Sequence, residues 1–264
     1  MYDIIMRILV CIRQIADPES RFSLSADALR IEIDPDSAFV INRYDEFAVE
    51  EALRIRDAIP GAAVDVISVG PQRAKEAIRR ALGMGAQAGI HILLEGSWFQ
   101  DSGTVARLIS SYARGQGYDL IFTGVMAEDT LNAQTGPRLA ELLGLPCATT
   151  VISQKLDRTL SVVRVEREIE ALTREEVTLR LPALLTVQSG INHPRYPTLS
   201  NLLRAKKQTI LTLEASSQDG ARTECVTIVR LFAPERERAG LVLEGTTAEK
   251  ARALCDILHE RALL

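Results

Sequence analysis

Short apolar runs alternate with amphipathic segments along the first half of the chain. Four of these runs have the length and composition of buried strands: residues 7–12, 64–69, 90–94 and 119–124. A polar stretch after the first run contains a predicted hairpin, with strands at residues 22–24 and 29–33. Strands that alternate with helical patterns are typical of a parallel sheet with helices on its faces. The pattern therefore predicts an α/β fold with a doubly wound, mostly parallel sheet.

Two of the intervening segments predict helices with one buried face. Asn42 is placed as the N-cap of the first helix, which runs to about residue 59. The second is expected to begin at Pro71, a residue favoured at the first helical position, and to end at Gly83 and Gly85. These glycines are not interpreted as a dinucleotide loop, because they follow a helix and precede a strand, the reverse of the order in that motif.

Beyond Val151 the sequence becomes more charged, with alternating polarity. Residues 161–170 and 175–187 predict antiparallel strands with one buried and one solvated face. The last predicted element is a helix that Thr246 and Glu249 would open as a capping box. Because residues 208–264 are few for an independent core, they are expected to pack on another subunit. The chain is therefore divided into a domain of residues 1–207 and an extension of residues 208–264.

Composition excludes several classes of partner. The chain has 264 residues, 47% of them hydrophobic, and a formal net charge of −4, which gives no reason to expect a nucleic-acid partner. No apolar run approaches the roughly 18 residues of a membrane span. The N-terminal apolar segment is interrupted by charges and lacks a signal-peptide cleavage site. No membrane insertion is expected, and the predicted location is cytoplasmic.

Metal-ligating residue types are scattered along the chain. The cysteines form no CxxC pair: Cys11, Cys147, Cys225 and Cys255. This spacing predicts neither a zinc site nor a redox dithiol, and free buried thiols are the favoured interpretation. The three histidines are equally dispersed and are interpreted as structural or surface residues. No metal site is therefore predicted.

The strongest candidate for a ligand site is residues 124–144. A loop follows the predicted strand and enters a helix at about Gln134, at the sheet edge where open α/β folds bind ligands. The N–H groups at a helix start favour a phosphate or another anion. Gly124 and Gly136 would permit close backbone approach, and Gln134 and Thr135 offer uncharged donors. These features favour nucleotide binding.

The alternative interpretation of the same loop is an ordinary capped helix after a strand. Asp129 and Asn132 would then serve only as turn and cap residues. The chain contains no P-loop, no GxSxG elbow and no HExxH motif. No catalytic residue is assigned, and a protein that binds a nucleotide without covalent chemistry fits the sequence best.

A second unusual segment is NHPRYPTLSNLLRAKK, residues 192–207. Its prolines, Pro194 and Pro197, predict an extended loop. Three leucines follow them, Leu199, Leu202 and Leu203, and a basic cluster closes the segment. The leucines could be core contacts of a capped helix, or Leu199 could point outward while Leu202 or Leu203 points inward.

In four stretches the chain resembles the beta subunit of electron transfer flavoproteins. These are RILVCIRQIADP, NRYDEFAVEEALRIRD, GVMAEDTLNAQTGP, and VEREIE together with residues 179–207. The last is the most specific, because the NxPRYxTL pattern followed by AKK is not the product of a general secondary-structure rule. The likeness runs from Met6 to about Lys207 and continues more loosely to the end of the chain.

The resemblance implies a Rossmann-like, adenine-nucleotide-binding subunit of a heterodimer whose alpha subunit holds a FAD. In most members the beta subunit carries a structural AMP, whereas in an electron-bifurcating branch it carries a second FAD that oxidises NADH. Such a subunit is an electron carrier more than a catalyst. The implied nucleotide contacts are Cys11, Asn42, Val69, Gly124, Ala127, Asp129, Asn132, Ala133, Gln134, Thr135 and Gly136.

The loop of this chain departs from both branches of the family. AMP-binding members tend to read DDDCNQTG and bifurcating members DGDTAQVG, whereas residues 129–136 read DTLNAQTG. Leu131 replaces an acid found in both branches, Ala133 resembles the bifurcating form and Thr135 the AMP form. AMP is favoured, with FAD as the alternative. A second departure is Ala171–Leu172, where the family turns through glycines or acids.

The resemblance also assigns a role to residues 192–207. In the family this loop docks an acyl-CoA dehydrogenase or a similar flavoenzyme, from which electrons pass to a downstream acceptor. Leu199 would be the anchoring side chain, with Tyr196 and Leu202 beside it. An unrelated adenine-nucleotide-binding module with the same broad architecture is the remaining rival interpretation.

Overall fold

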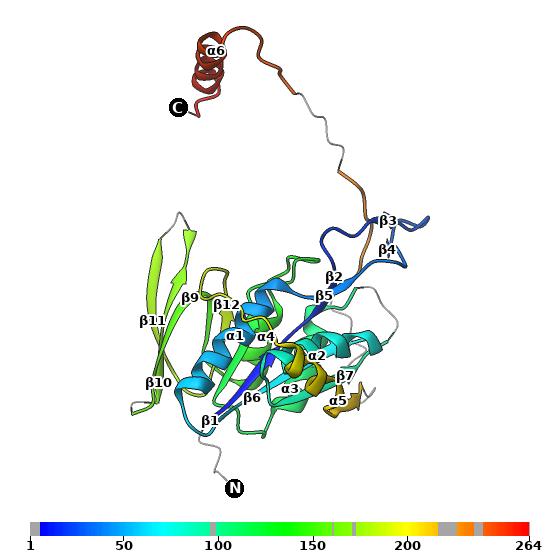
Figure 1. Ribbon diagram of the computed structural model, residues 1–264, viewed down its shortest axis with the longest axis vertical. Coiled ribbons are helices and arrows are strands. Elements are labelled where there is room, and N and C mark those ends of the chain that lie inside the picture. The colour runs from blue at the N-terminus through cyan, green and yellow to red at the C-terminus, as the bar shows by residue number, and fades with distance from the viewer. Residues whose placement is uncertain are drawn as a thin grey trace. The chain divides into compact units, whose positions relative to one another are not determined.

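The computed structural model describes residues 6–95, 99–159, 161–170, 173–215, 226–234 and 240–263. Its largest sheet has nine strands. Its order is β11-β10-β9-β12-β8-β1-β6-β7-β13. Figure 1 shows β10 and β11 at one edge of this sheet. The strands are β1 (Met6–Cys11), β6 (Ala62–Gly70), β7 (Ala88–Leu93), β8 (Leu120–Gly124), β9 (Cys147–Asp157), β10 (Val162–Glu168), β11 (Arg174–Arg180), β12 (Ala183–Val187) and β13 (Ile210–Glu214). The pairings from β9 to β13 along this order are parallel, whereas β10 and β11 add antiparallel strands at one edge.

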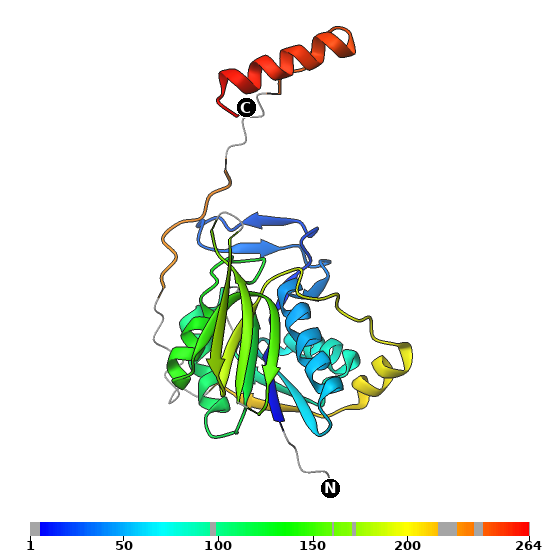
Figure 2. The ribbon, with the colours of Figure 1, turned by 90° about the vertical axis from the view of Figure 1, so that its left-hand side faces the viewer.

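Helices cover both faces of this sheet (Figure 2), as the alternation of strands and helices predicts. They are α1 (Arg43–Ala58), α2 (Lys75–Met84), α3 (Ser102–Ala113), α4 (Thr135–Leu143) and α5 (Leu199–Lys207). Ile8 and Val10 of β1 belong to the core that contains α1 and α2, whereas Leu9 and Cys11 belong to the core of α3 and α4. Successive side chains of a strand point to opposite faces, so a doubly covered strand must be apolar throughout.

Two small sheets stand apart from the central one. The first pairs β2 (Gln14–Ala16) with β5 (Phe39–Ile41), and the second pairs β3 (Phe22–Leu24) with β4 (Ile31–Ile33). Both pairs are antiparallel. The second is the hairpin that the sequence predicts at residues 22–24 and 29–33.

The predicted second helix is confirmed with changed ends. A short 3-10 turn, η1 (Gln72–Ala74), follows Pro71 and leads directly into α2. Gly83 lies inside α2, so it is not the end of the helix. Gly85 terminates it with a φ of +132°, a conformation that glycine adopts without steric cost.

Residues 175–187 are not one antiparallel strand, so that prediction is wrong. β11 ends at Arg180 and pairs antiparallel with β10, whereas β12 begins at Ala183 and lies parallel between β8 and β9. Pro182 has no N–H to donate to a ladder, which favours a break at this position. All five residues of β12 are buried, so they fit the middle of the sheet and not a half-solvated edge.

The chain divides into two compact units, Met1–Arg230 and Leu231–Leu264. β13 extends the sheet of the first unit beyond residue 207, although the sequence did not predict this strand. In the second unit, α6 (Thr247–Glu260) carries the predicted capping box between Thr246 and Glu249. None of its residues is buried, and Leu254 is exposed. Packing of residues 208–264 on a partner subunit stays a prediction.

The cysteines differ in their surroundings. Cys11 is buried, Cys147 is partly buried and Cys255 is exposed, so the expectation of a buried thiol is wrong for Cys255. Cys225 and the turn at Ala171–Leu172 lie outside the described residues. Within the part of the chain that is described, no cluster of His, Cys, Asp and Glu suits a metal ion. No helix there has the length and apolar character to cross a membrane.

Candidate functional site

A cleft opens at the carboxyl ends of β1 and β8, with a cavity volume of about 80 Å³. From β1 the chain continues to β6 and β7 on one side, and it then returns to β8 on the other side of β1. The cleft therefore lies at the point where the strand order reverses. Ligands of open α/β sheets bind at this topological switch point.

Ten of the eleven residues for which the resemblance implies nucleotide contacts line this cleft: Cys11, Asn42, Val69, Gly124, Ala127, Asn132, Ala133, Gln134, Thr135 and Gly136. Asp129 is the exception and lines a neighbouring cavity instead. Its Oδ2 accepts hydrogen bonds from Arg13 Nη2 at 2.7 Å and from Nε at 3.0 Å. Ten of the predicted residues thus lie together around one cleft, whereas the Asp129 carboxylate forms an ion pair with Arg13.

The backbone between Leu131 and α4 has an unusual conformation. Leu131 and Ala133 have φ angles of +53° and +52°, a backbone conformation that residues other than glycine rarely adopt. Ala133 is followed by Gln134 in the right-handed region, with φ −104° and ψ −25°. When a residue in the left-handed region is followed by one in the right-handed region, successive backbone N–H groups can point into one concavity that binds anions. Since α4 begins at Thr135, its unpaired N–H groups and dipole add to the same site.

Asn42 holds the loop against α1. It is the N-cap of this helix as predicted, yet its side chain makes no capping hydrogen bond. Instead its Nδ2 donates to Met126 O at 2.9 Å, and its Oδ1 accepts from Glu128 N at 3.1 Å. Both functional groups of this buried amide therefore fix the loop backbone.

Asp45 is a site residue that the sequence does not reveal. Its buried carboxylate accepts two backbone hydrogen bonds: Oδ1 from Gly124 N at 3.0 Å and Oδ2 from Arg13 N at 2.7 Å. Burial raises the pKa of Asp45 to about 7, although these hydrogen bonds favour the ionised form and oppose the shift. Its acceptor role could not be read from the sequence, because both donors are distant from it along the chain.

The two loop glycines are needed for packing within the protein. A Cβ added at Gly136 would lie 2.6 Å from Thr186 Cγ2 and 2.8 Å from Thr123 Oγ1. A Cβ at Gly124 would meet Asp45 and the Tyr44 backbone. The close backbone approach expected at these glycines therefore occurs toward β8, β12 and α1.

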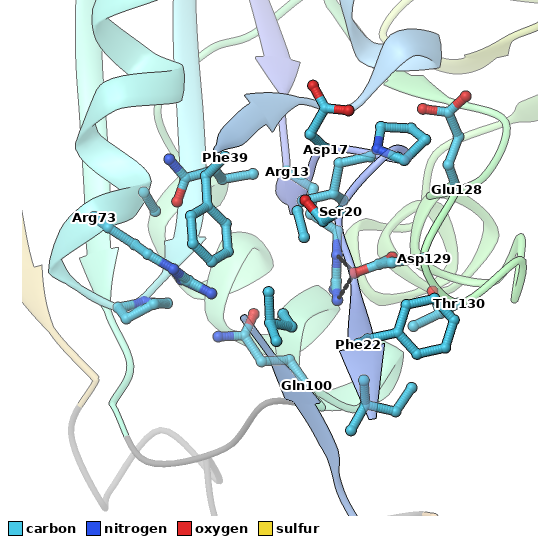
Figure 3. A pocket seen from close by; sticks show the side chains of 18 of the residues that line it. Arg13, Asp17, Ser20, Phe22, Phe39, Arg73, Gln100, Glu128, Asp129 and Thr130 are labelled. Atoms are coloured by element: carbon cyan, nitrogen blue, oxygen red, sulfur yellow. Dashed lines mark hydrogen bonds and ion pairs between the residues drawn. The ribbon is translucent and has the colours of Figure 1, made fainter. Parts of the chain in front are cut away.

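A larger cavity of about 380 Å³ adjoins the cleft (Figure 3). Arg13, Val69, Gln100 and Thr130 line both cavities. On one wall the Arg73 guanidinium lies over the Phe39 ring, 4.1 Å from its centroid. Burial and the nearby Arg13 charge lower the pKa of Arg73. One wall of the larger cavity is therefore aromatic and cationic, and Asp17, Glu128 and Asp129 line the cavity as well.

The leucines of residues 192–207 lie in different surroundings. Leu199 and Tyr196 are 73% and 88% exposed, and Leu203 is exposed as well. Leu202 is partly buried and packs against Gly83 of α2. The contact is so close that a Cβ added at Gly83 would lie 2.9 Å from Leu202 Cδ2. The alternative in which all three leucines are core contacts is therefore wrong. A docking role for Tyr196, Leu199 and Leu202 stays a prediction.

Comparisons with known proteins show which family the chain belongs to. A model of the electron transfer flavoprotein domain matches residues 32–218. The chain is 32% identical over 262 residues to an electron transfer flavoprotein subunit beta of Bacillus subtilis, which covers 97% of this chain and 99% of that protein. It is 33% identical over 267 residues to a subunit beta of Thermoanaerobacterium thermosaccharolyticum, covering 98% and 100%. The subunit beta of Mus musculus is 33% identical over 251 residues, covering 91% and 94%. The chain therefore belongs to the electron transfer flavoprotein beta-subunit family.

Proposed function

We propose that this chain is the nucleotide-holding beta subunit of a heterodimeric electron transfer flavoprotein. It binds a structural AMP, while an alpha subunit holds the FAD that carries electrons from an acyl-CoA dehydrogenase-type flavoenzyme to a downstream acceptor. The observation that supports this most strongly is the cleft at the switch point, with the Ala133–Gln134 turn and the start of α4 at its wall. This chain binds and positions groups, and the flavin supplies the redox chemistry.

Backbone groups would hold the phosphate of the nucleotide. Within the described lining of the cleft Arg13 is the only cationic side chain, and it is already paired with Asp129. Neutral N–H donors at a helix start and in a concave turn bind phosphate without a lysine or arginine. Asn42 and Asp45 would act indirectly, by fixing the loop that carries these donors.

The loop sequence favours a monophosphate over a dinucleotide. Thr135, which resembles the AMP form of the loop, lines the cleft. AMP is therefore the nucleotide that this proposal assigns to the chain.

The larger cavity supports a second candidate, an electron-bifurcating subunit with FAD in this site. The cleft alone is smaller than the roughly 300 to 1,000 Å³ typical of ligand pockets, whereas the adjoining cavity of about 380 Å³ reaches that range. A dinucleotide that extends from the cleft would place its second half beside Phe39 and Arg73. Such a subunit would oxidise NADH.

Cofactor analysis of the purified heterodimer separates these proposals. Denaturation releases the bound nucleotides, which are identified and counted by chromatography against the protein concentration. One FAD and one AMP per heterodimer are expected. Two FAD and no AMP would support the bifurcating candidate, and a single FAD with no other adenine nucleotide would contradict both.

A further inference from the structure

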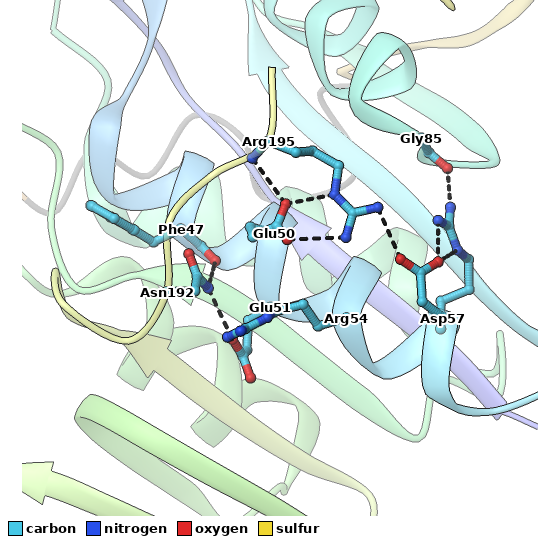
Figure 4. Close-up of polar contacts among 9 residues, drawn as sticks. Phe47, Glu50, Glu51, Arg54, Asp57, Gly85, Asn192 and Arg195 are labelled. Carbon is cyan, nitrogen blue, oxygen red and sulfur yellow. Dashed lines mark hydrogen bonds and ion pairs between the residues drawn. The ribbon is translucent and has the colours of Figure 1, made fainter. Parts of the chain in front are cut away.

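The start of residues 192–207 is fastened to α1 by a group of polar contacts (Figure 4). The Arg195 guanidinium forms a two-pronged contact with Glu50, through Nε to Oε2 at 2.8 Å and Nη2 to Oε1 at 3.0 Å. Its backbone N–H donates to the same carboxylate at 3.1 Å, and its Nη1 donates to Asp57 Oδ2 at 2.9 Å. Three residues earlier, Asn192 Nδ2 donates to Phe47 O and to Glu51 Oε2.

These contacts are well placed to fix a single backbone geometry. Glu50 is only 5% exposed, so its carboxylate depends on Arg195 for neutralisation. A guanidinium that meets a carboxylate with two parallel hydrogen bonds also fixes the relative orientation of the two groups. The Arg195 backbone N–H ties the main chain itself to α1. The contact therefore limits the movement of the loop as well as its side chains.

The far end of the segment is held on α2. Ala205 is buried, Leu202 packs beside Gly83, and Arg79 Nη1 donates to Lys206 O at 2.9 Å. Between the two anchored ends stand Tyr196 and Leu199, whose side chains are largely exposed. An exposed apolar side chain on a fixed backbone loses little conformational freedom when a partner covers it.

We propose that Arg195 is a positioning residue for docking: its contacts with Glu50 and Asp57 hold Leu199 in the orientation in which a flavoenzyme partner binds it. This inference rests on the proposed function, because it presupposes that Leu199 meets such a partner. Arg195 itself acts through the loop backbone.

The test compares Arg195→Lys, Leu199→Ala and the double variant in the complete heterodimer. Lysine keeps the charge opposite Glu50 but lacks the two-pronged geometry. The assay measures KM and kcat of an acyl-CoA dehydrogenase, supplied with its acyl-CoA, with the heterodimer as electron acceptor. Arg195→Lys should raise KM about tenfold with kcat within about twofold, and it should add no further increase in the Leu199→Ala background.

A matched control and a partner-free readout accompany this assay. The control is Arg80→Lys, which alters another arginine–carboxylate contact of α1, between Arg80 Nε and Glu46 Oε1 at 2.7 Å. Because this contact does not hold the loop, the substitution should leave KM unchanged. Amide hydrogen exchange across residues 196–201 should be about tenfold faster in Arg195→Lys. If that variant does not fold, Asp57→Asn removes one arm of the contact and should shift KM and exchange in the same direction by a smaller factor.

The outcomes separate this inference from the proposed function. If Leu199→Ala raises KM while Arg195→Lys leaves both KM and exchange unchanged, the positioning role is overturned and docking through Leu199 stands. Additive effects in the double variant would also overturn it, because Arg195 would then act independently of Leu199. An unchanged KM in Leu199→Ala would overturn docking and the positioning role together.

Discussion

Replacing Gly136 by alanine tests whether the start of α4 holds a nucleotide phosphate. The added methyl group would lie 2.6 Å from Thr186 Cγ2 and 2.8 Å from Thr123 Oγ1, well inside van der Waals contact. Overpacking of this kind costs about 1 to 3 kcal/mol, which for a chain of this size lowers the melting temperature by roughly 2 to 12 °C. A movement of α4 away from the sheet would relieve the clash. The Ala133–Gln134 turn would move with it, so we expect the nucleotide to be lost.

Gly144 provides a matched control at the other end of the same helix. A Cβ there meets no atom within 4 Å, but its φ of +68° makes alanine unfavourable by about 1 to 2 kcal/mol. Both substitutions should therefore lower the melting temperature of the heterodimer. Only Gly136→Ala should release the nucleotide, which chromatography of the denatured protein measures. Equal nucleotide content in Gly136→Ala and the unmodified protein would refute the assignment of the phosphate to this helix start.

Three further predictions concern the docking loop, the buried carboxylate and the tail. Leu199→Ala should leave the melting temperature and the flavin content nearly unchanged, because truncation of an exposed side chain costs within about 0.5 kcal/mol. The same variant should slow partner-dependent reduction of the flavin about tenfold, and a normal rate would contradict docking. The pKa of Asp45 is about 7 in the folded protein and about 3.9 in the unfolded chain. The protonated group therefore contributes to stability below pH 4, and this contribution is lost as the pH rises through 7. The melting temperature of Asp45→Asn relative to the unmodified protein should therefore rise between pH 5 and 8, and parallel profiles would count against the shift. Because α6 has no buried residue, proteases should cleave the chain within residues 208–264 when the alpha subunit is absent. Equal resistance to proteolysis with and without that subunit would argue against packing of the tail.

Local patterns in the sequence predict the elements that have a continuous apolar signal. β1, β6, β7 and β8 are such runs, and α4 begins where the small and polar loop residues end. β9 was missed because only two of its eleven residues are buried, which leaves no apolar run to recognise. β13 is short and half-exposed for a similar reason.

Contacts between distant parts of the chain could not be read from the same patterns. Asp45 has the appearance of an acidic residue in the first turn of a helix, and its hydrogen bonds to Arg13 and Gly124 depend on the order of strands in the sheet. The cavity beside Phe39 and Arg73 is also built from elements far apart in sequence. The resemblance to a family did identify the cleft, because its motifs reflect such contacts.

Hydrogen exchange of the nucleotide-free heterodimer, with AMP or with adenosine added, tests the central claim most directly. AMP should slow exchange of the amides of residues 133–136, since these N–H groups would face its phosphate. Adenosine lacks the phosphate and should leave those amides unprotected. Equal protection by the two ligands, or none by AMP, would contradict the proposal that this turn and the start of α4 bind the phosphate of an adenine nucleotide.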